Sequence, residues 1–147
     1  MNPEYQRARF LVSQPQEGLP PRFGIVTTCN PNGVLSDEAQ NLAATERLRK
    51  QLEAAERVFF PVIGCSPDLV HQELGFGVVC QTPDEVVELG RSWQQEAVFW
   101  IESGRVHLLP CAEGDVFVLG KWSSLAQPVQ QANSWLARLV TESGERQ

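Results

Sequence analysis

The sequence lacks any long hydrophobic run. Its longest apolar stretches fall well short of the roughly 20 residues that a bilayer-spanning helix needs. No basic, then apolar, then small-residue segment opens the chain either, which is the pattern of a secretory leader. We therefore expect a cytoplasmic protein with no membrane partner.

Basic residues are also few. The chain has 12 Lys and Arg against 18 Asp and Glu, a net charge of −6, and the basic residues are scattered rather than grouped in a stripe. Binding to nucleic acid requires basic side chains that neutralise phosphates. The composition therefore predicts no nucleic-acid partner, and it leaves a homo-oligomer open.

Motifs of high specificity are missing as well. There is no GxGxxG or Walker pattern and no paired CxxC, so no cofactor is expected. The four cysteines lack the density of a disulfide scaffold and are expected to be free thiols. Two minor alternatives remain: a zinc site formed by Cys29, Cys65, His71 and Cys111, or a thiol nucleophile at Cys29 or Cys65 with His71 as its base.

What is present indicates one globular domain. The length of 147 residues, with 42% hydrophobic and 20% charged residues, is typical of a single core. We assign residues 23–111 to this core. Residues 1–22 form an N-terminal arm, within which 1–12 is an edge strand or a loose segment, and residues 112–147 form a C-terminal extension.

Strands and helices alternate along the core. Short β-branched or apolar runs predict strands, and apolar residues at helical spacing behind a cap or a first-turn proline predict helices. Ser36 stands at the expected cap, and Ser103-Gly104 is a two-residue hairpin turn. The expected elements are strands at 23–29, 58–63, 74–80, 97–102, 105–109 and 116–119, and helices at 36–55, 83–93 and 128–140.

This order predicts an α+β fold. Strand, helix, strand, strand, helix, strand is the split βαβ arrangement of a ferredoxin-like core, with an antiparallel sheet and both helices on one face. Right-handed crossovers place strands 23–29 and 74–80 side by side and antiparallel in the middle of that sheet. Strand 105–109 then extends an edge as an added hairpin strand, and helix 128–140 packs on the outside.

The topology gathers polar residues from distant segments at one sheet edge. The end of the first strand, the start of the first helix, the loop 64–73 and the start of strand 97–102 all emerge there. The candidate ligand-binding residues at this edge are Asn30, Ser36, Asn41, Asp68, Glu73 and Gln95.

Two kinds of chemistry fit this edge. The turn at Asn30 followed by the cap at Ser36 puts free amides and a helix dipole where an anion binds, although a plain turn and cap explain the same residues. Asp68 and Glu73 could act as an acid and base pair with His71 as a titrating partner, although loop carboxylates are more often solvated.

The same residues carry a family resemblance. An Asn30-Pro31 turn follows a strand ending in Thr-Thr, Ser36 and Asn41 lie in the next helix, the segment 64–68 leads to Glu73, and Gln95-Glu96-Ala97 precedes the strand with Trp100. Over residues 23–100 the chain resembles a bacterial family known as domain of unknown function 3293. The resemblance implies that Asn30, Ser36, Asn41, Glu73 and Gln95 act together. The chain departs from the family at Asn32-Gly33 and in its extension past Pro110.

Two functional hypotheses follow. The favoured one is a small cytosolic ligand-binding domain, which could be an enzyme, with a small anionic ligand at the polar edge. The other is an interaction or regulatory module that binds a partner through an exposed strand edge or through helix 128–140. No catalytic residue is assigned on either hypothesis.

Overall fold

The structure is a computed structural model that describes residues 3–13 and 19–129. Within these residues the chain forms one eight-stranded sheet in the order β7-β6-β5-β2-β4-β3-β1-β8. The elements along the chain are η1 (Pro3–Arg7), β1 (Arg9–Val12), β2 (Arg22–Thr27), η2 (Pro31–Gly33), α1 (Glu38–Ala54), β3 (Phe59–Cys65), β4 (Gln72–Val79), α2 (Pro83–Ser92), β5 (Ala97–Glu102), β6 (Arg105–Pro110), β7 (Phe117–Lys121), α3 (Trp122–Leu125) and β8 (Ala126–Pro128).

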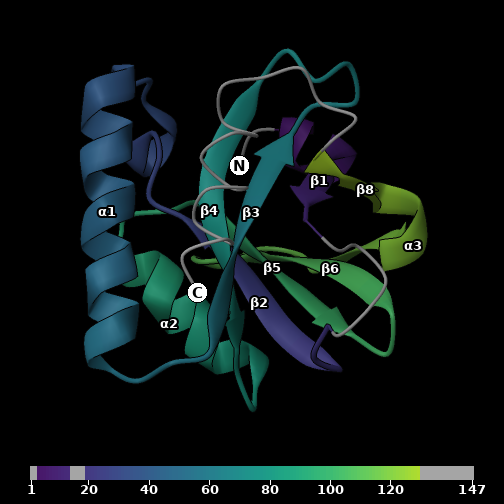
Figure 1. Ribbon diagram of the computed structural model, residues 1–147. Coiled ribbons are helices and arrows are strands. Elements are labelled where there is room, and N and C mark those ends of the chain that lie inside the picture. The colour runs from purple at the N-terminus through teal and green to yellow at the C-terminus, as the bar shows by residue number, and fades with distance from the viewer. Residues whose placement is uncertain (1–2, 14–18, 130–147) are drawn as a thin grey trace.

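The sheet is mixed and curls into a half-barrel (Figure 1). β1 pairs antiparallel with β3 and parallel with β8. The single helical turn α3 contacts both β7 and β8, and so connects the two outer strands of the sheet. The predicted ferredoxin-like core is therefore wrong: the described residues form an eight-stranded curled sheet with three α-helices.

The N-terminal arm is the physical reason for this error. Residues 9–12 alternate too imperfectly to predict a buried strand, yet Phe10, Leu11 and Val12 are almost fully buried. β1 is an interior strand of the sheet, because both β3 and β8 pair with it. The predicted antiparallel pair at the centre is nevertheless present: β2 lies beside β4, with Thr27 opposite Gly75.

An aromatic cluster fills the inside of the curl. Phe10 packs edge-on against Phe99, with ring centroids 5.0 Å apart, and stacks on Trp122 at 5.4 Å. Phe23 contacts both Phe60 and Trp122 edge-on. Such pairs add about 0.5–1.5 kcal/mol each beyond simple burial. This cluster separates the two ends of the half-barrel.

Helices α1 and α2 cover the outer face of the sheet (Figure 1). Leu48 and Leu52 of α1 and Val86 of α2 pack into one cluster with sheet residues such as Val26 and Trp100. Both predicted helices are thus present on one face. α1 begins at Glu38, however, and its cap is Asp37, whose Oδ1 accepts a hydrogen bond from Gln40 N at 2.7 Å. Ser36 precedes the cap.

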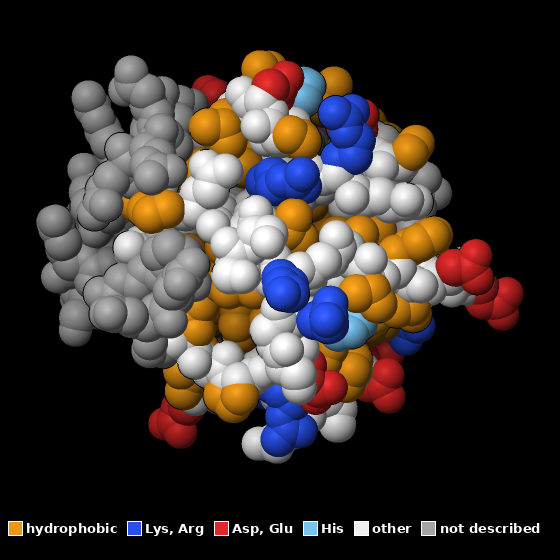
Figure 2. All heavy atoms as spheres, turned by 90° about the vertical axis from the view of Figure 1, so that its right-hand side faces the viewer, with side chains coloured by type: hydrophobic (Ala, Val, Ile, Leu, Met, Phe, Trp, Pro, Cys, Tyr) orange, Lys and Arg blue, Asp and Glu red, His pale blue; other side chains and the backbone are white. Residues whose placement is uncertain are grey.

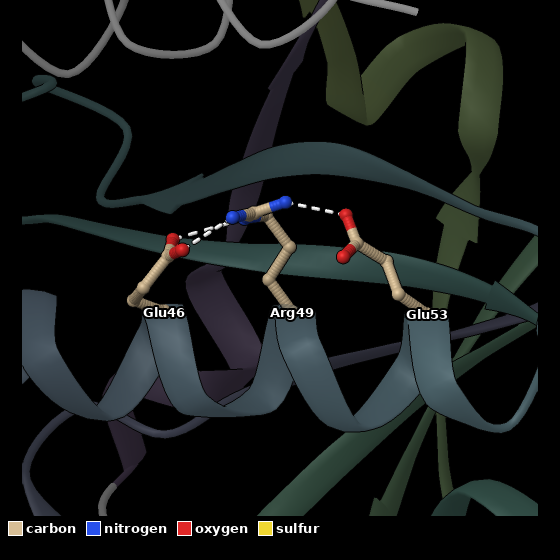
Figure 3. A network of polar contacts seen from close by, with 3 residues as sticks. All are labelled: Glu46, Arg49 and Glu53. Carbon is tan, nitrogen blue, oxygen red and sulfur yellow. Dashed lines mark hydrogen bonds and ion pairs between the residues drawn. The ribbon is translucent and has the colours of Figure 1, made fainter.

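The opposite face of α1 is solvated, as the charged residues between its apolar positions predict. Arg49 lies between Glu46 and Glu53 and pairs with both (Figure 3). These side chains are one-third to one-half exposed, and exposed pairs at this helical spacing stabilise a helix by only about 0.3–0.5 kcal/mol each. These ion pairs stabilise α1 and are not part of the candidate functional site.

The remaining predictions concern the ends of the chain. The predicted strand 116–119 is present as β7, which forms the outer edge in place of β6. The predicted helix 128–140 lies outside the described residues beyond Val129, and Pro128 ends β8. Among the described residues no helix has the length and apolar character to cross a membrane.

Gly24 allows the close approach of α2 to the sheet. A Cβ at this position would lie 2.4 Å from Val86 Cγ2, a β-branched side chain that cannot move aside. We expect Gly24→Ala to lower the free energy of unfolding by about 1–3 kcal/mol, the usual cost of overpacking a core. Urea unfolding measures this. The control is Gly64→Ala in β3, where the nearest atom is 4.0 Å away, and an equal loss in both variants would contradict the packing explanation.

Candidate functional site

Asn30 is the centre of a polar cluster at one end of the sheet. It follows β2 with a left-handed backbone, φ 50° and ψ 62°, a conformation that Asn tolerates better than most residues. Its Oδ1 accepts hydrogen bonds from Ser36 N at 2.9 Å and from Asn41 Nδ2 at 3.1 Å. Its Nδ2 donates to Glu73 Oε1 at 2.8 Å. One side chain therefore joins β2, the loop before α1, α1 itself and β4.

The start of α1 is fixed to this turn from the other direction. Asn41 Oδ1 accepts a hydrogen bond from Asn30 N at 3.0 Å. Thr45, one turn further along, donates from Oγ1 to the Asn41 carbonyl at 2.8 Å and lies 3.4 Å from Thr28 Oγ1. Asn30 and Asn41 thus hydrogen-bond each other reciprocally.

Glu73 is a half-buried carboxylate in β4, opposite Gly64 of β3. Among the described residues, the hydrogen bond from Asn30 is the one that its side chain makes. Burial raises the pKa of Glu73 above its ordinary value, and the Asn30 hydrogen bond and the nearby His71 oppose this rise. A partly desolvated carboxylate with a single donor retains lone pairs for a further hydrogen-bonding partner.

Gln95 and Glu96 reach the cluster from the segment before β5. Gln95 is buried, and its Nε2 donates to the Cys29 carbonyl at 3.2 Å and to the Trp93 carbonyl at 3.3 Å. Glu96 lies against the Asn30 turn, since a Cβ on Gly33 would lie 1.9 Å from its Oε1. Gly33 also has φ +74°, a backbone conformation that favours glycine there.

Tyr5 brings the N-terminal segment to the same end of the sheet. Its ring packs against the aromatic cluster inside the curl. Burial raises the pKa of Tyr5 to about 12, and the charges of Glu73 and Glu96 contribute. Burial, followed by the charge of Glu73, also raises the pKa of the Cys29 thiol to about 11. The surroundings of Glu73 therefore contain a phenol and a thiol that both stay protonated at neutral pH.

The structure brings together five of the six predicted site residues: Asn30, Ser36, Asn41 and Glu73 by direct hydrogen bonds, and Gln95 through the Cys29 carbonyl. Asp68 is not among them. It is exposed, accepts hydrogen bonds from Ser66 Oγ and Val70 N, and so stabilises the tip of the β3–β4 loop. These contacts hold its pKa below the ordinary value. An acid and base pair of Asp68 with Glu73 has no support in this geometry.

The four proposed zinc ligands are dispersed. Cys65 donates to the Arg9 carbonyl, Cys111 lies beneath Gly90 of α2, and His71 is exposed on its loop. Within residues 3–13 and 19–129 no group of three or more His, Cys, Asp or Glu side chains could hold a metal ion. Burial also raises the pKa of the Cys65 thiol to about 11, which disfavours the thiolate that a metal ligand or nucleophile needs.

Sequence reasoning missed Tyr5 and Thr45 as members of this cluster. Glu96 belongs to the Gln95-Glu96-Ala97 motif that carries the family resemblance, and that motif was the signal that could have identified Glu96 as a site residue. Tyr5 gave none, because its place depends on β1 joining the sheet between β3 and β8. Thr45 looked like any polar residue on a helix, and its role appears only once Asn41 is placed.

A hollow in the described part of the molecule lies away from this cluster. A cavity of about 570 Å³ lies at the opposite end of the half-barrel, between the segment before β2, the β5–β6 turn and α3. The polar cluster is a hydrogen-bonded surface at the sheet end. Function at that cluster therefore has to be inferred from its chemistry.

The fold and the cluster define a class: a small α+β protein with one curled sheet, whose strand ends hold a partly buried carboxylate in an asparagine network. Residues 26–98 match the family model described as Protein of unknown function (DUF3293). The resemblance predicted from the motifs is thus confirmed over this segment, which contains the whole set from Asn30 to Gln95 and excludes Tyr5. Searches of curated proteins and of solved structures each found no match.

Glu73→Gln tests the environment of the carboxylate. A folded-state pKa above the ordinary value of 4.5 means that protonation favours folding. The contribution of this group to stability is therefore fully present below pH 4.5 and is lost as the pH rises through the folded-state pKa. Gln does not ionise, and its Oε1 can still accept the hydrogen bond from Asn30. We expect the variant to gain stability relative to wild type between about pH 4 and pH 7.

Urea unfolding at a series of pH values measures this difference. The change Glu113→Gln at an exposed position reports the effect of net charge alone. If Glu73→Gln and wild type show parallel stability curves across this range, Glu73 is not desolvated in the folded state.

Proposed function

We propose that the Asn30–Glu73 cluster binds a small ligand and that Glu73 is the side chain that contacts it. The observation that carries this proposal is the Glu73 carboxylate, which is half-buried, has a raised pKa and receives a single hydrogen bond from the described residues. Desolvating a carboxylate with so few donors costs stability, and such costs are concentrated at functional sites. The family resemblance supports the choice, because it spans Asn30, Asn41 and Glu73.

The chemistry of the cluster favours a ligand that donates hydrogen bonds. The amides of Ser36 and Gln40 are already bonded to Asn30 Oδ1 and Asp37 Oδ1. The Asp37 cap also places a negative charge at the start of α1, where an anion would otherwise bind. Glu73 and Glu96 add two more carboxylates nearby. A hydroxyl or amine group on the ligand fits these acceptors better than the anionic ligand suggested by the sequence.

An enzyme is one form of this proposal. A carboxylate with a raised pKa is suited to accept a proton near neutral pH, and the protonated Tyr5 lies within its electrostatic range. We place the protein in the cytoplasm, since its cysteines are free and buried.

A second candidate, a protein interaction module, is favoured by one observation. Val34 and Leu35 are 68% and 86% exposed on the loop that Asn30 fixes to β4. Apolar side chains held outward on a well-anchored loop are typical of contact surfaces. On this interpretation the Asn30 network only shapes the loop.

A thermal-shift screen distinguishes the two candidates. The library should contain amines, polyols, amino acids and nucleosides, with anionic metabolites as the contrasting set. A ligand at about 100 times its dissociation constant adds roughly 2.7 kcal/mol of stability. We expect hits among the hydrogen-bond donors, and we expect Glu73→Gln to lose them while remaining folded.

The control variant is Leu35→Ser, which removes an exposed apolar side chain and leaves the carboxylate intact. Hits that persist in Glu73→Gln would place the ligand elsewhere. A screen without hits would favour the interaction module, for which Leu35→Ser is then the informative change.

A further inference from the structure

We propose that β7 is a docking edge to which a second copy of this chain adds its own β7, antiparallel and across a two-fold axis. β7 is the last strand on one side of the sheet, and β6 is its partner. Within residues 3–13 and 19–129, no backbone hydrogen bond joins the other side of β7 to another segment, although η1 lies close to it. A row of unpaired amide and carbonyl groups is a template for a further strand.

Two exposed apolar side chains lie along this edge. Val118 lies opposite His107 of β6, which in turn lies opposite Trp100 of β5. Opposed residues share a face of the sheet, and Trp100 packs in the cluster beneath α1 and α2, so Val118 is on the helix-side face. Val116 lies two residues earlier in an extended segment and shares that face. The helices pack over β4, β2 and β5, which leaves Val116 and Val118 58% and 59% exposed.

Charge is distributed unevenly along the same segment. Asp115 lies before β7 and Lys121 ends it, and both are exposed. Arg105 of β6 lies directly opposite Lys121, and like charges in this position destabilise a sheet. In the described part of the chain neither base forms an ion pair. Figure 2 shows hydrophobic side chains exposed among Lys and Arg side chains on the side of the molecule that carries β6.

This polarity selects a second copy as the occupant. In an antiparallel pair the start of each strand lies beside the end of the other. Two paired copies of β7 therefore bring Asp115 of each copy toward Lys121 and Arg105 of the other, and two-fold symmetry repeats the contact. The edge is thus complementary to itself in charge, and the attraction offsets the repulsion between Lys121 and Arg105.

The apolar residues are complementary in the same arrangement. With Phe117 on the two-fold axis, Val116 of each copy lies opposite Val118 of the other. Cross-strand pairs of β-branched residues stabilise a sheet by about 0.2–1 kcal/mol each. The four exposed valines of the two copies then cover one another on the helix-side face.

A β-bulge limits the length of the contact. The register between β6 and β7 shifts between Val106 and His107, and Gly120 has φ +144°. Bulges twist an edge away from a partner, so the regular pairing is confined to residues 115–118. Stable interfaces bury at least about 1,200 Å², and a contact of this length buries less. We therefore expect weak, reversible association of the two copies.

Sedimentation velocity of the full chain from about 10 µM to about 1 mM measures this association, a range that covers weak dissociation constants. We expect a concentration-dependent equilibrium between monomer and dimer. Val118→Lys should weaken it by about tenfold or more, because the contact would bury an unpaired charge. Val70→Lys is the matched control, since Val70 is 71% exposed on the β3–β4 loop, and it should leave the dissociation constant unchanged. Circular dichroism checks that each variant is folded.

Charge reversal tests the antiparallel orientation. Asp115→Lys and Lys121→Glu should each weaken the dimer by about fivefold, because like charges then meet at both ends of the contact. The two changes in one chain restore opposite charges and should restore the affinity. Asp115→Lys also reduces the net negative charge of the protein, so a general effect of charge would strengthen association instead.

Three results would overturn the proposal. The first is a wild-type chain that stays monomeric throughout, even where an acidic peptide of another protein binds at β7. The second is an equal effect of Val70→Lys and Val118→Lys. The third is a double charge reversal that remains as weak as either single variant, and this result is decisive even if Val118→Lys does not fold.

Discussion

The hydrogen bond from Asn30 to Glu73 is the interaction on which the polar end of the molecule depends. It spans the ends of two paired strands, β2 and β4, and fixes the loop that leads into α1. A half-buried carboxylate is costly unless it is paired, and the left-handed backbone of Asn30 is costly for most residues. The hydrogen bond from Asn30 pairs the Glu73 carboxylate, and the same bond offsets the cost of the left-handed backbone at Asn30. The Asn30 side chain also accepts hydrogen bonds from Ser36 and Asn41, which fixes their positions.

The curled sheet keeps two chemically different ends apart. At one end, carboxylates, amides and a protonated phenol surround Glu73. At the other end, a largely apolar cavity lies between the segment before β2, the β5–β6 turn and α3. The aromatic cluster of Phe10, Phe23, Phe99 and Trp122 fills the space between them.

Much of the candidate site follows from local sequence patterns, because strong turns and regular alternation determine where strands end. Asn30 directly follows a β-branched strand, and Glu73 directly precedes an apolar one, so antiparallel pairing of β2 with β4 brings them together. The complete fold could not be predicted in the same way. Its closure depends on β1, whose four residues gain their place from pairing with β3 and β8 rather than from their own pattern.

The errors at single residues have the same origin. Ser36 and Asp37 are both good caps, and it is the Asp37 side chain that accepts the hydrogen bond from Gln40 N in the first turn of α1. Asp68 satisfies its own loop, which no spacing rule reveals. The charge of Glu73 affects the pKa of Tyr5 only because β1 places the N-terminal segment beside β3 and β8. Local sequence patterns therefore predict where the polar cluster lies. Long-range strand pairing determines which residues belong to it.

A double-mutant cycle on Asn30→Gly and Glu73→Ala tests the central claim most directly. Glycine keeps the left-handed backbone available, so the first change removes only the side chain. If the two residues depend on each other, their effects on the free energy of unfolding at neutral pH should be non-additive, with a coupling of about 1 kcal/mol or more. Effects that add to within about 0.3 kcal/mol would contradict the claim, because the Asn30–Glu73 hydrogen bond would then contribute nothing to the folded protein.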